Sequence, residues 1–384
     1  MLLHSIATSL AVSLAAAVTL AGTRIIEPST ALVVAPFHEA FHVRGDDGRT
    51  HVEYDLLVTN VFDGEVTVTT LEITNEAGKV IGHIDGRELA QATQTLIDGK
   101  PAKAIPPSGS VAIEVDLVLP AGMLPKRLSH RLVYDFAQGD PLASLIGSRE
   151  VVGVEVEVSK SEPVPIVAPL TGPGWVAFNG CCVPNIHRNV RIAAGTRIAT
   201  PETFAIDWIQ VEGGAFFEGD GKANKQFPYF GAEVRSVADG EVVAVRDDMV
   251  ESQPFMAPKT VHAPNDYAGN HVIVRIRPDV YALYAHLQAG KIAVKIGDKV
   301  KAGARIGKLG NSGNSSAPHL HFGLLDRPDP LTGNSLPFVI DQFELTGKVE
   351  AGEKEQEGRA LTVTPASGKV EAAYPLVGGV ATFR

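Results

Sequence analysis

Cysteine is scarce in this chain, whose 384 residues include only two, the adjacent Cys181 and Cys182. Two cysteines cannot build a disulfide scaffold or a four-cysteine zinc site. The chain has 12 histidines, so histidine and carboxylate side chains would have to hold any transition metal. The cysteine pair itself fits three interpretations, namely a vicinal disulfide, a bond between two chains, or two reduced small apolar side chains.

Positive charge is also in short supply. The 34 Lys and Arg residues are outnumbered by 44 Asp and Glu residues, which gives a formal net charge of −10. This balance argues against a nucleic-acid binder that works by neutralising phosphates. With 45% hydrophobic and 20% charged residues, the chain can bury a core and is not a disordered tail. At roughly 150 residues per domain, its length predicts two or three domains.

Long apolar runs are limited to one, Ser5–Gly22, which is rich in Ala, Ser and Thr. Its small residues predict a secretory signal peptide over residues 1–25, although the preceding residues lack Lys and Arg. An uncleaved membrane anchor is the competing interpretation, because about 20 apolar residues span a bilayer. Since no second run approaches this length, we expect the remainder to be exported, either periplasmic or extracellular and associated with the cell wall.

Residues 27–159 show the pattern of successive strands. Val111–Leu119 alternates apolar and polar side chains, and His51–Asn60 and Glu65–Thr74 are rich in β-branched residues, with a turn at Asp63-Gly64 between them. This predicts an immunoglobulin-like β-sandwich. It could bind wall material, cover the substrate groove or orient a catalytic domain. Its histidines are scattered, and we predict a surface or structural role for each of them: His38, His42, His51, His83 and His130.

The remainder of the chain divides into three predicted segments. Residues 160–174 are a proline-spaced linker, because proline cannot continue a ladder or a helix. Residues 175–345 are predicted to form a second β-rich domain. Residues 346–384 are predicted to be a charged loop and a C-terminal tail, with short β-like pieces that the pattern does not place.

Chemistry is concentrated in the second predicted domain. His319 and His321 have the spacing that puts two imidazoles on one face of a strand. His286 ends an apolar strand, and His187 follows a Cys-Cys-Val-Pro-Asn loop. Asp207 lies within an otherwise apolar strand, where a carboxylate is costly unless it is paired, hydrogen-bonded or bound to a metal.

An ordered series of motifs in this region resembles the lysostaphin/LytM-type zinc endopeptidases, which cut peptide bonds in peptidoglycan. The resemblance covers about residues 175–325, under half of the chain. The motifs that carry it are Ala238-Asp-Gly-Glu-Val-Val243, Gly269-Asn-His-Val-Ile-Val274, Tyr284-Ala-His-Leu287, Val300-Lys-Ala-Gly-Ala-Arg-Ile-Gly307, Gly310-Asn-Ser-Gly-Asn-Ser-Ser316 and Pro318-His-Leu-His-Phe322.

The resemblance implies a duplicated-hybrid-motif peptidase fold and one Zn²⁺ per chain. Carried over by position, the metal ligands are His187, Asp207 and His321, and the catalytic residues are His286 and His319. Members of the family usually place the first histidine and the aspartate four residues apart, whereas twenty positions separate them here. We expect the intervening segment to form a loop that returns the chain to the same point.

The chemistry of these residues agrees with what the resemblance implies. Two neutral imidazoles and a carboxylate suit Zn²⁺ and leave a position for water, whose pKa on the metal falls to about 7. One non-ligand histidine would act as base and acid, and the other would stabilise the oxyanion. Activity is then expected to fall below about pH 6, as the histidines become protonated.

Three other functions fit parts of the sequence. A biotinyl- or lipoyl-type carrier shares the glycine-rich wording of residues 296–303, but no methionine adjoins a lysine as such a carrier requires. A catalytically inert relative would bind peptidoglycan or activate an amidase, but such proteins typically lose a ligand and every candidate is present here. A zinc endopeptidase could instead act on a protein rich in polyglycine. The sequence does not choose between these two substrates, and the resemblance implies the peptide cross-links of peptidoglycan as the partner.

Overall fold

The structure is a computed structural model that describes residues 28–349 and 361–384. Within these ranges the chain is mainly β, as predicted, with one short α-helix, α1 (Gly86–Ala92). None of the helices in the described ranges has the length and apolar character needed to cross a membrane. The predicted signal peptide, residues 1–25, lies outside the described residues.

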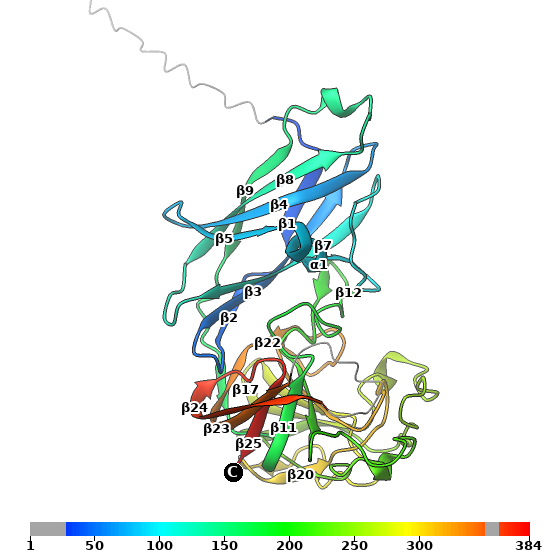
Figure 1. Ribbon diagram of the computed structural model, residues 1–384. Helices are drawn as coiled ribbons and strands as arrows, with labels where there is room; N and C mark the ends of the chain where they lie inside the picture. The colour runs from blue at the N-terminus through cyan, green and yellow to red at the C-terminus, as the bar shows by residue number, and fades with distance from the viewer. Residues whose placement is uncertain (1–27, 350–360) are drawn as a thin grey trace, which may run out of the picture.

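The N-terminal region (residues 28–159) consists of two antiparallel sheets, which form the upper half of the molecule in Figure 1. Apolar side chains from both sheets, such as Leu56 and Leu132, meet in one core between them. One sheet contains β1 (Leu32–Pro36), β2 (Phe41–Arg44), β3 (Thr50–Asn60), β6 (Thr93–Thr95) and β7 (Ser110–Leu119); the other contains β4 (Val66–Asn75), β5 (Val80–Asp85), β8 (Arg127–Phe136) and β9 (Glu150–Glu157).

The connection at Asp63-Gly64 crosses from one sheet to the other. The two strands that it joins, β3 and β4, lie in different sheets and are not paired with each other. The reason is that β3 is paired on both sides, with β7 along one edge and with β1 and β2 along the other. No edge of β3 is left free for β4.

The C-terminal region (residues 160–349 and 361–384) contains a twelve-stranded sheet and two short two-stranded sheets. All pairings in the large sheet are antiparallel except that of β10 with β23. Its strands are β10 (Val164–Ile166), β11 (Gly172–Phe178), β14 (Ile206–Gln210), β16 (Gly240–Arg246), β17 (His271–Arg277), β18 (Val280–Ala285), β19 (Lys299–Val300), β21 (Leu320–Leu325), β22 (Ser335–Leu336), β23 (Phe338–Val349), β24 (Val363–Ala373) and β25 (Gly379–Phe383).

The predicted linker contributes to this sheet. Strand β10 lies inside residues 160–174 and pairs with β23. Val164 and Ile166 are buried, while Pro165 between them is exposed. Because β10 is an edge strand, the missing N–H of Pro165 removes no ladder hydrogen bond from the interior of the sheet.

The predicted C-terminal tail is also part of the sheet. Strand β24 pairs with β23, and β25 lies between β23 and β11. Phe383 in β25 is buried against Trp208 of β14, with ring centroids 5.2 Å apart. The sequence indicated short β-like pieces here but not where they pack, because their place is determined by contacts with strands distant in the sequence.

The two regions touch through β2 and the turn that follows it. Val43 of β2 is buried in the core of the C-terminal region. The main chain of Tyr374 bonds that of Arg44 at 2.8 Å and that of Asp46 at 3.1 Å. Nearby, Cys181 and Cys182 are paired as a vicinal disulfide.

Candidate metal centre

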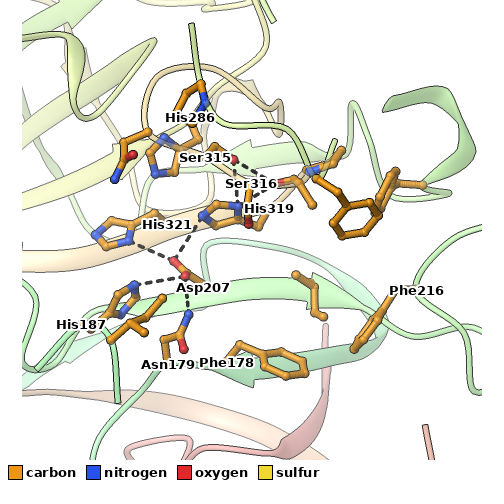
Figure 2. A pocket seen from close by; sticks show the side chains of 18 of the residues that line it. Phe178, Asn179, His187, Asp207, Phe216, His286, Ser315, Ser316, His319 and His321 are labelled. Atoms are coloured by element: carbon orange, nitrogen blue, oxygen red, sulfur yellow. Dashed lines mark hydrogen bonds and ion pairs between the residues drawn. The ribbon is translucent and has the colours of Figure 1, made fainter. Parts of the chain in front are cut away.

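Three neighbouring strands bring most of the predicted site residues together. In the sheet, β14 lies beside β21, and β21 lies beside β18. The register pairs Asp207 with His321 and pairs His321 with Ala285, the residue before His286. Since directly opposite residues project from the same face, Asp207 and His321 meet, as Figure 2 shows.

His187 reaches the same point from a loop after β11. The segment between His187 and Asp207 contains the two-stranded sheet of β12 (Ile192–Ala194) and β13 (Arg197–Ala199). This small hairpin returns the chain to β14, so that His187 Nε2 lies 3.0 Å from Asp207 Oδ2. Residues twenty positions apart are thus brought into contact.

The Asp207 carboxylate is the centre of a buried polar cluster. Its Oδ1 lies 2.9 Å from His321 Nδ1 and 3.3 Å from His319 Nε2. Its Oδ2 contacts His187 and accepts a hydrogen bond of 2.8 Å from Asn179 Nδ2. Asn179 follows β11 directly, and nothing in its sequence context had marked it as a site residue.

The charges of the cluster shift its pKa values in opposite directions. Burial alone would raise the pKa of Asp207, but the neighbouring His187 and His319 hold it well below its usual range. Burial alone would lower the pKa of His187, but the Asp207 carboxylate raises it to about 9. The same carboxylate raises the pKa of His319 against the effect of burial. The buried Asp207 carboxyl is therefore held in its charged form, which is the form that binds a metal ion.

His286 lies on the other side of the cluster, with its ring centroid 4.8 Å from that of His319. Its backbone has a φ of 60°, which a non-glycine residue adopts rarely and at some cost. The Nδ1 atom bonds the main-chain oxygen of Ser312 at 2.8 Å. Burial, followed by the nearby His319 and His321, holds the pKa of His286 well below its usual range.

Two glycines allow the Ser312 loop to approach closely enough to hold His286. Gly269 and Gly313 both have a positive φ, and their backbones pack directly against each other. A Cβ atom on Gly313 would collide with the backbone of Gly269. This contact explains why the two glycine motifs accompany the histidines in the sequence.

The donor set fits a zinc ion. One nitrogen of His187, one nitrogen of His321 and one oxygen of Asp207 all lie within 4.8 Å of one another. Two imidazoles and a carboxylate match the ligand preference of Zn²⁺. His286, His319 and His321 form a second, overlapping group of this kind, but it lacks the carboxylate. In the first group, the negative charge of the buried Asp207 would compensate that of the cation.

The cluster lines a cleft with a volume of about 440 Å³. Five phenylalanines also line this cleft: Phe178, Phe216, Phe217, Phe227 and Phe255.

Two further polar residues, Glu202 and Tyr267, line the cleft near the cluster, and the sequence analysis did not single them out. The Glu202 carboxylate lies 4.0 Å from His187 Nε2. Burial and this carboxylate raise the pKa of Tyr267 above its usual range.

The remaining histidines described by the structure stay outside the cleft lining. In the N-terminal region, His51 pairs with Asp47 and Asp116, and His130 bonds the hydroxyl of Tyr54 at 2.7 Å. His271 lies in β17 and bonds the Gly269 main-chain oxygen. These contacts agree with the structural roles expected for scattered histidines.

Sheet and donor set together define a β-rich protein with a buried His/Asp/His cluster in a cleft. The model of Peptidase family M23 matches residues 226–332. The chain therefore contains a domain of this family, and the matched range includes His286, His319 and His321. His187 and Asp207 lie before it.

Several characterised proteins resemble the chain over short stretches. "Peptidoglycan DD-endopeptidase ShyA" of Vibrio cholerae is 45% identical over 65 residues, 17% of this chain and 15% of that protein. "Glycyl-glycine endopeptidase ALE-1" of Staphylococcus capitis is 32% identical over 96 residues, 25% of this chain and 22% of that protein. The chain thus spans less than a quarter of the length of these relatives.

A solved structure also aligns with the chain. The catalytic domain of the antimicrobial peptidase lysostaphin from Staphylococcus simulans has 26% sequence identity and a TM-score of 0.21. The alignment covers 31% of this chain and 88% of that one.

Proposed function

We propose that the protein is an exported zinc endopeptidase that hydrolyses peptide cross-links of bacterial peptidoglycan. The observation that carries the proposal is the convergence of four histidines and Asp207 in one cleft. The M23 domain and relatives named as peptidoglycan DD-endopeptidase and glycyl-glycine endopeptidase support the substrate class. A relative named as a metalloprotease supports a metal-dependent reaction.

In this proposal His187, Asp207 and His321 hold one Zn²⁺, and His286 and His319 are the catalytic residues. A bound Zn²⁺ acts as a Lewis acid and makes a water molecule nucleophilic near neutral pH. The hydrogen bond from His286 to Ser312 O, and that from His319 Nδ1 to Ala317 O at 2.8 Å, involve Nδ1. This leaves His286 Nε2 facing the cleft, while His319 Nε2 contacts Asp207 Oδ1 at 3.3 Å.

The two catalytic histidines have different roles in this proposal. One Nε2 accepts the proton of the attacking water and returns it to the leaving amine. The other donates a hydrogen bond to the oxygen that becomes negative in the tetrahedral intermediate. The pKa of His286 is lowered and that of His319 is raised, and this opposition suits a pair in which one imidazole accepts a proton and the other donates a hydrogen bond.

The same proposal assigns the duplicated-hybrid-motif fold to residues 175–345. It assigns an immunoglobulin-like topology to residues 27–159, with residues 160–174 as the link between the two domains. Export to the periplasm, or to the cell wall, follows from the predicted signal peptide and from the location of the substrate.

The matched substitutions His321→Ala and His286→Ala test the assignment of roles. We expect His321→Ala to lose both bound zinc and cleavage of cross-linked muropeptides, because it removes a ligand. His286→Ala should retain one zinc per chain and lose turnover. Zinc content is measured by elemental analysis, and cleavage by separating the muropeptides after digestion.

The overlapping three-histidine group supplies the alternative outcome. If His286→Ala loses zinc while His187→Ala retains it, the metal is held by His286, His319 and His321 and the assignment of roles is wrong. Stoichiometric zinc in the wild type with no cleavage of any cross-linked wall preparation would favour an inert peptidoglycan-binding relative instead.

A further inference from the structure

The residue next to His187 extends into the N-terminal region. Arg188 is 1% exposed. Its Nε donates to Asp55 Oδ1 at 2.9 Å, and one terminal nitrogen donates to the main-chain oxygens of Tyr54 at 2.8 Å and Val115 at 3.0 Å. Tyr54 and Asp55 lie in β3, and Val115 lies in β7. A single side chain thus joins the loop of the first proposed ligand to two strands of the other region.

Arg188 belongs to a buried ionic cluster between the two regions. Arg191 contacts Asp55 Oδ2 at 3.0 Å and Glu114 Oε1 at 2.7 Å. Glu53 lies 3.2 Å from the remaining terminal nitrogen of Arg188. Burying so many charges is expensive, and apolar residues often replace such clusters without loss of stability. Stability alone therefore does not explain why these charges are buried, whereas the positions that they fix for the attached loop can explain it.

His187, the first proposed ligand, depends on these contacts because it does not lie in a hydrogen-bonded strand. Asp207 and His321 lie opposite each other on paired strands. His187 lies in a loop, twenty positions before Asp207. Asn185 Oδ1 accepts the main-chain N–H groups of both His187, at 2.9 Å, and Arg188, at 3.2 Å. This turn ties the backbone of His187 to that of Arg188. The imidazole itself bonds the main-chain oxygen of Ala205 through Nδ1 at 3.1 Å, and Arg188 holds the backbone that carries it.

We propose that Arg188 is a positioning residue for the metal centre, and that through it the N-terminal region sets the affinity of the site for zinc. This inference rests on the metal site proposed above. Among the three roles considered for the N-terminal region, it selects orientation of the catalytic residues. The N-terminal region is then a structural part of the site, because β3 and β7 hold the loop that contains the ligand His187.

Zinc affinity of the full-length chain tests the proposal. The dissociation constant is measured by competition with a chelator for the wild type, Arg188→Lys and the control Tyr54→Phe. Lysine retains the charge but cannot make the forked contacts to Asp55, Tyr54 and Val115 at once. Tyr54 lies beside Asp55 in β3. Tyr54→Phe removes the hydroxyl that bonds His130 but keeps the main-chain oxygen that accepts from Arg188.

We expect Arg188→Lys to weaken zinc binding by about 10- to 100-fold, the effect usual for groups that orient metal ligands. Tyr54→Phe should lower the unfolding midpoint and leave the zinc dissociation constant unchanged. Equal zinc affinity in Arg188→Lys and the wild type would overturn the proposal. So would an equal loss of affinity in both variants, because the effect would then be one of general stability.

A second readout uses the metal-free protein. Hydrogen exchange of the amides of residues 185–191 should be faster in Arg188→Lys than in the wild type, while exchange in β14 and β21 stays the same. If Arg188→Lys does not fold, Asp55→Asn changes the other side of the contact, and its zinc affinity and exchange decide in the same way. A wild-type chain that binds no zinc refutes the proposed function, whereas unchanged exchange over residues 185–191 refutes the anchoring itself.

Discussion

At the scale of single residues, the site is organised around one carboxylate. Asp207 contacts three imidazoles and the Asn179 amide, so its orientation determines where the nitrogens converge. The sequence marked Asp207 as unusual because a carboxylate in an apolar strand requires a partner. It did not mark Asn179, whose role depends on the pairing of β11 with β14. Single asparagines after a strand are too common to indicate such a contact.

Asn179→Ala tests the importance of this orientation. The substitution removes the hydrogen bond to Asp207 Oδ2 and keeps all three proposed ligands. We expect the zinc affinity to fall by about tenfold or more, as for other groups that orient metal ligands. The measurement is the zinc dissociation constant by chelator competition, and an affinity equal to that of the wild type would show that the strands alone orient the carboxylate.

The pH dependence of zinc binding follows from His187. Its pKa is raised to about 9 in the protein without metal, so below pH 9 the imidazole carries a proton that zinc must displace. The apparent affinity should therefore rise by about tenfold per pH unit for each proton displaced. Titrations at pH 6.5, 7.5 and 8.5 measure this slope, and an affinity independent of pH would contradict the raised pKa.

At the scale of elements, the register of β14, β21 and β18 creates the site, and the C-terminal strands support it. The strand-like segments and the same-face placement of His319 and His321 could be predicted from alternation alone. The pairing of β24 and β25 with β23 and β11 could not, because it depends on contacts between residues distant in sequence. Phe383 illustrates this, since its partner Trp208 lies beside Asp207 in β14.

Phe383→Ala tests whether β25 is integral to the core. Removing a buried aromatic side chain leaves a cavity, so we expect the free energy of unfolding to fall by about 3–5 kcal/mol. Urea unfolding of the metal-free protein measures the change. Leu145→Ala is the control, since Leu145 is 72% exposed and its loss should change stability by less than about 0.5 kcal/mol. Similar effects of the two substitutions would mean that β25 contributes no more than an exposed loop.

Asp46 links the turn after β2 to the segment after β24, and the burial of its carboxyl is predicted to make the fold less stable as the pH rises. Its Oδ2 accepts the main-chain N–H of Leu376 at 3.3 Å. Burial raises the pKa of Asp46 from 3.8 to about 6. Folding therefore favours the protonated form, and the associated stability is present below pH 3.8 and is lost as the pH rises to about 6.

Asp46→Asn should remove this dependence, because the amide stays neutral and still offers an oxygen to Leu376. The variant should gain stability relative to the wild type as the pH rises from 4.5 to about 6, with a constant difference above that. Urea unfolding of both proteins at pH 4.5, 5.5 and 7 gives the difference. A difference that stays constant over the whole series would show that Asp46 ionises as freely in the folded chain as in the unfolded one.

At the scale of the whole molecule, the two regions are joined where the site is built. The composition and motifs were sufficient to predict a mainly β chain and the candidate residues. They could not predict that Arg188, adjacent to a proposed ligand, contacts β3 and β7. Contacts between regions involve residues whose local sequence carries no periodic signal, so only the assembled structure displays them.

Whether this cleft is a zinc-dependent peptidase site can be decided by one titration. The full-length protein is stripped of metal, Zn²⁺ is added in steps, and the cleavage of cross-linked muropeptides is measured at each step. We expect cleavage to rise with bound zinc and to reach its maximum at one zinc per chain. Zinc that binds at one per chain without any cleavage, or cleavage that persists in the stripped protein, would contradict it.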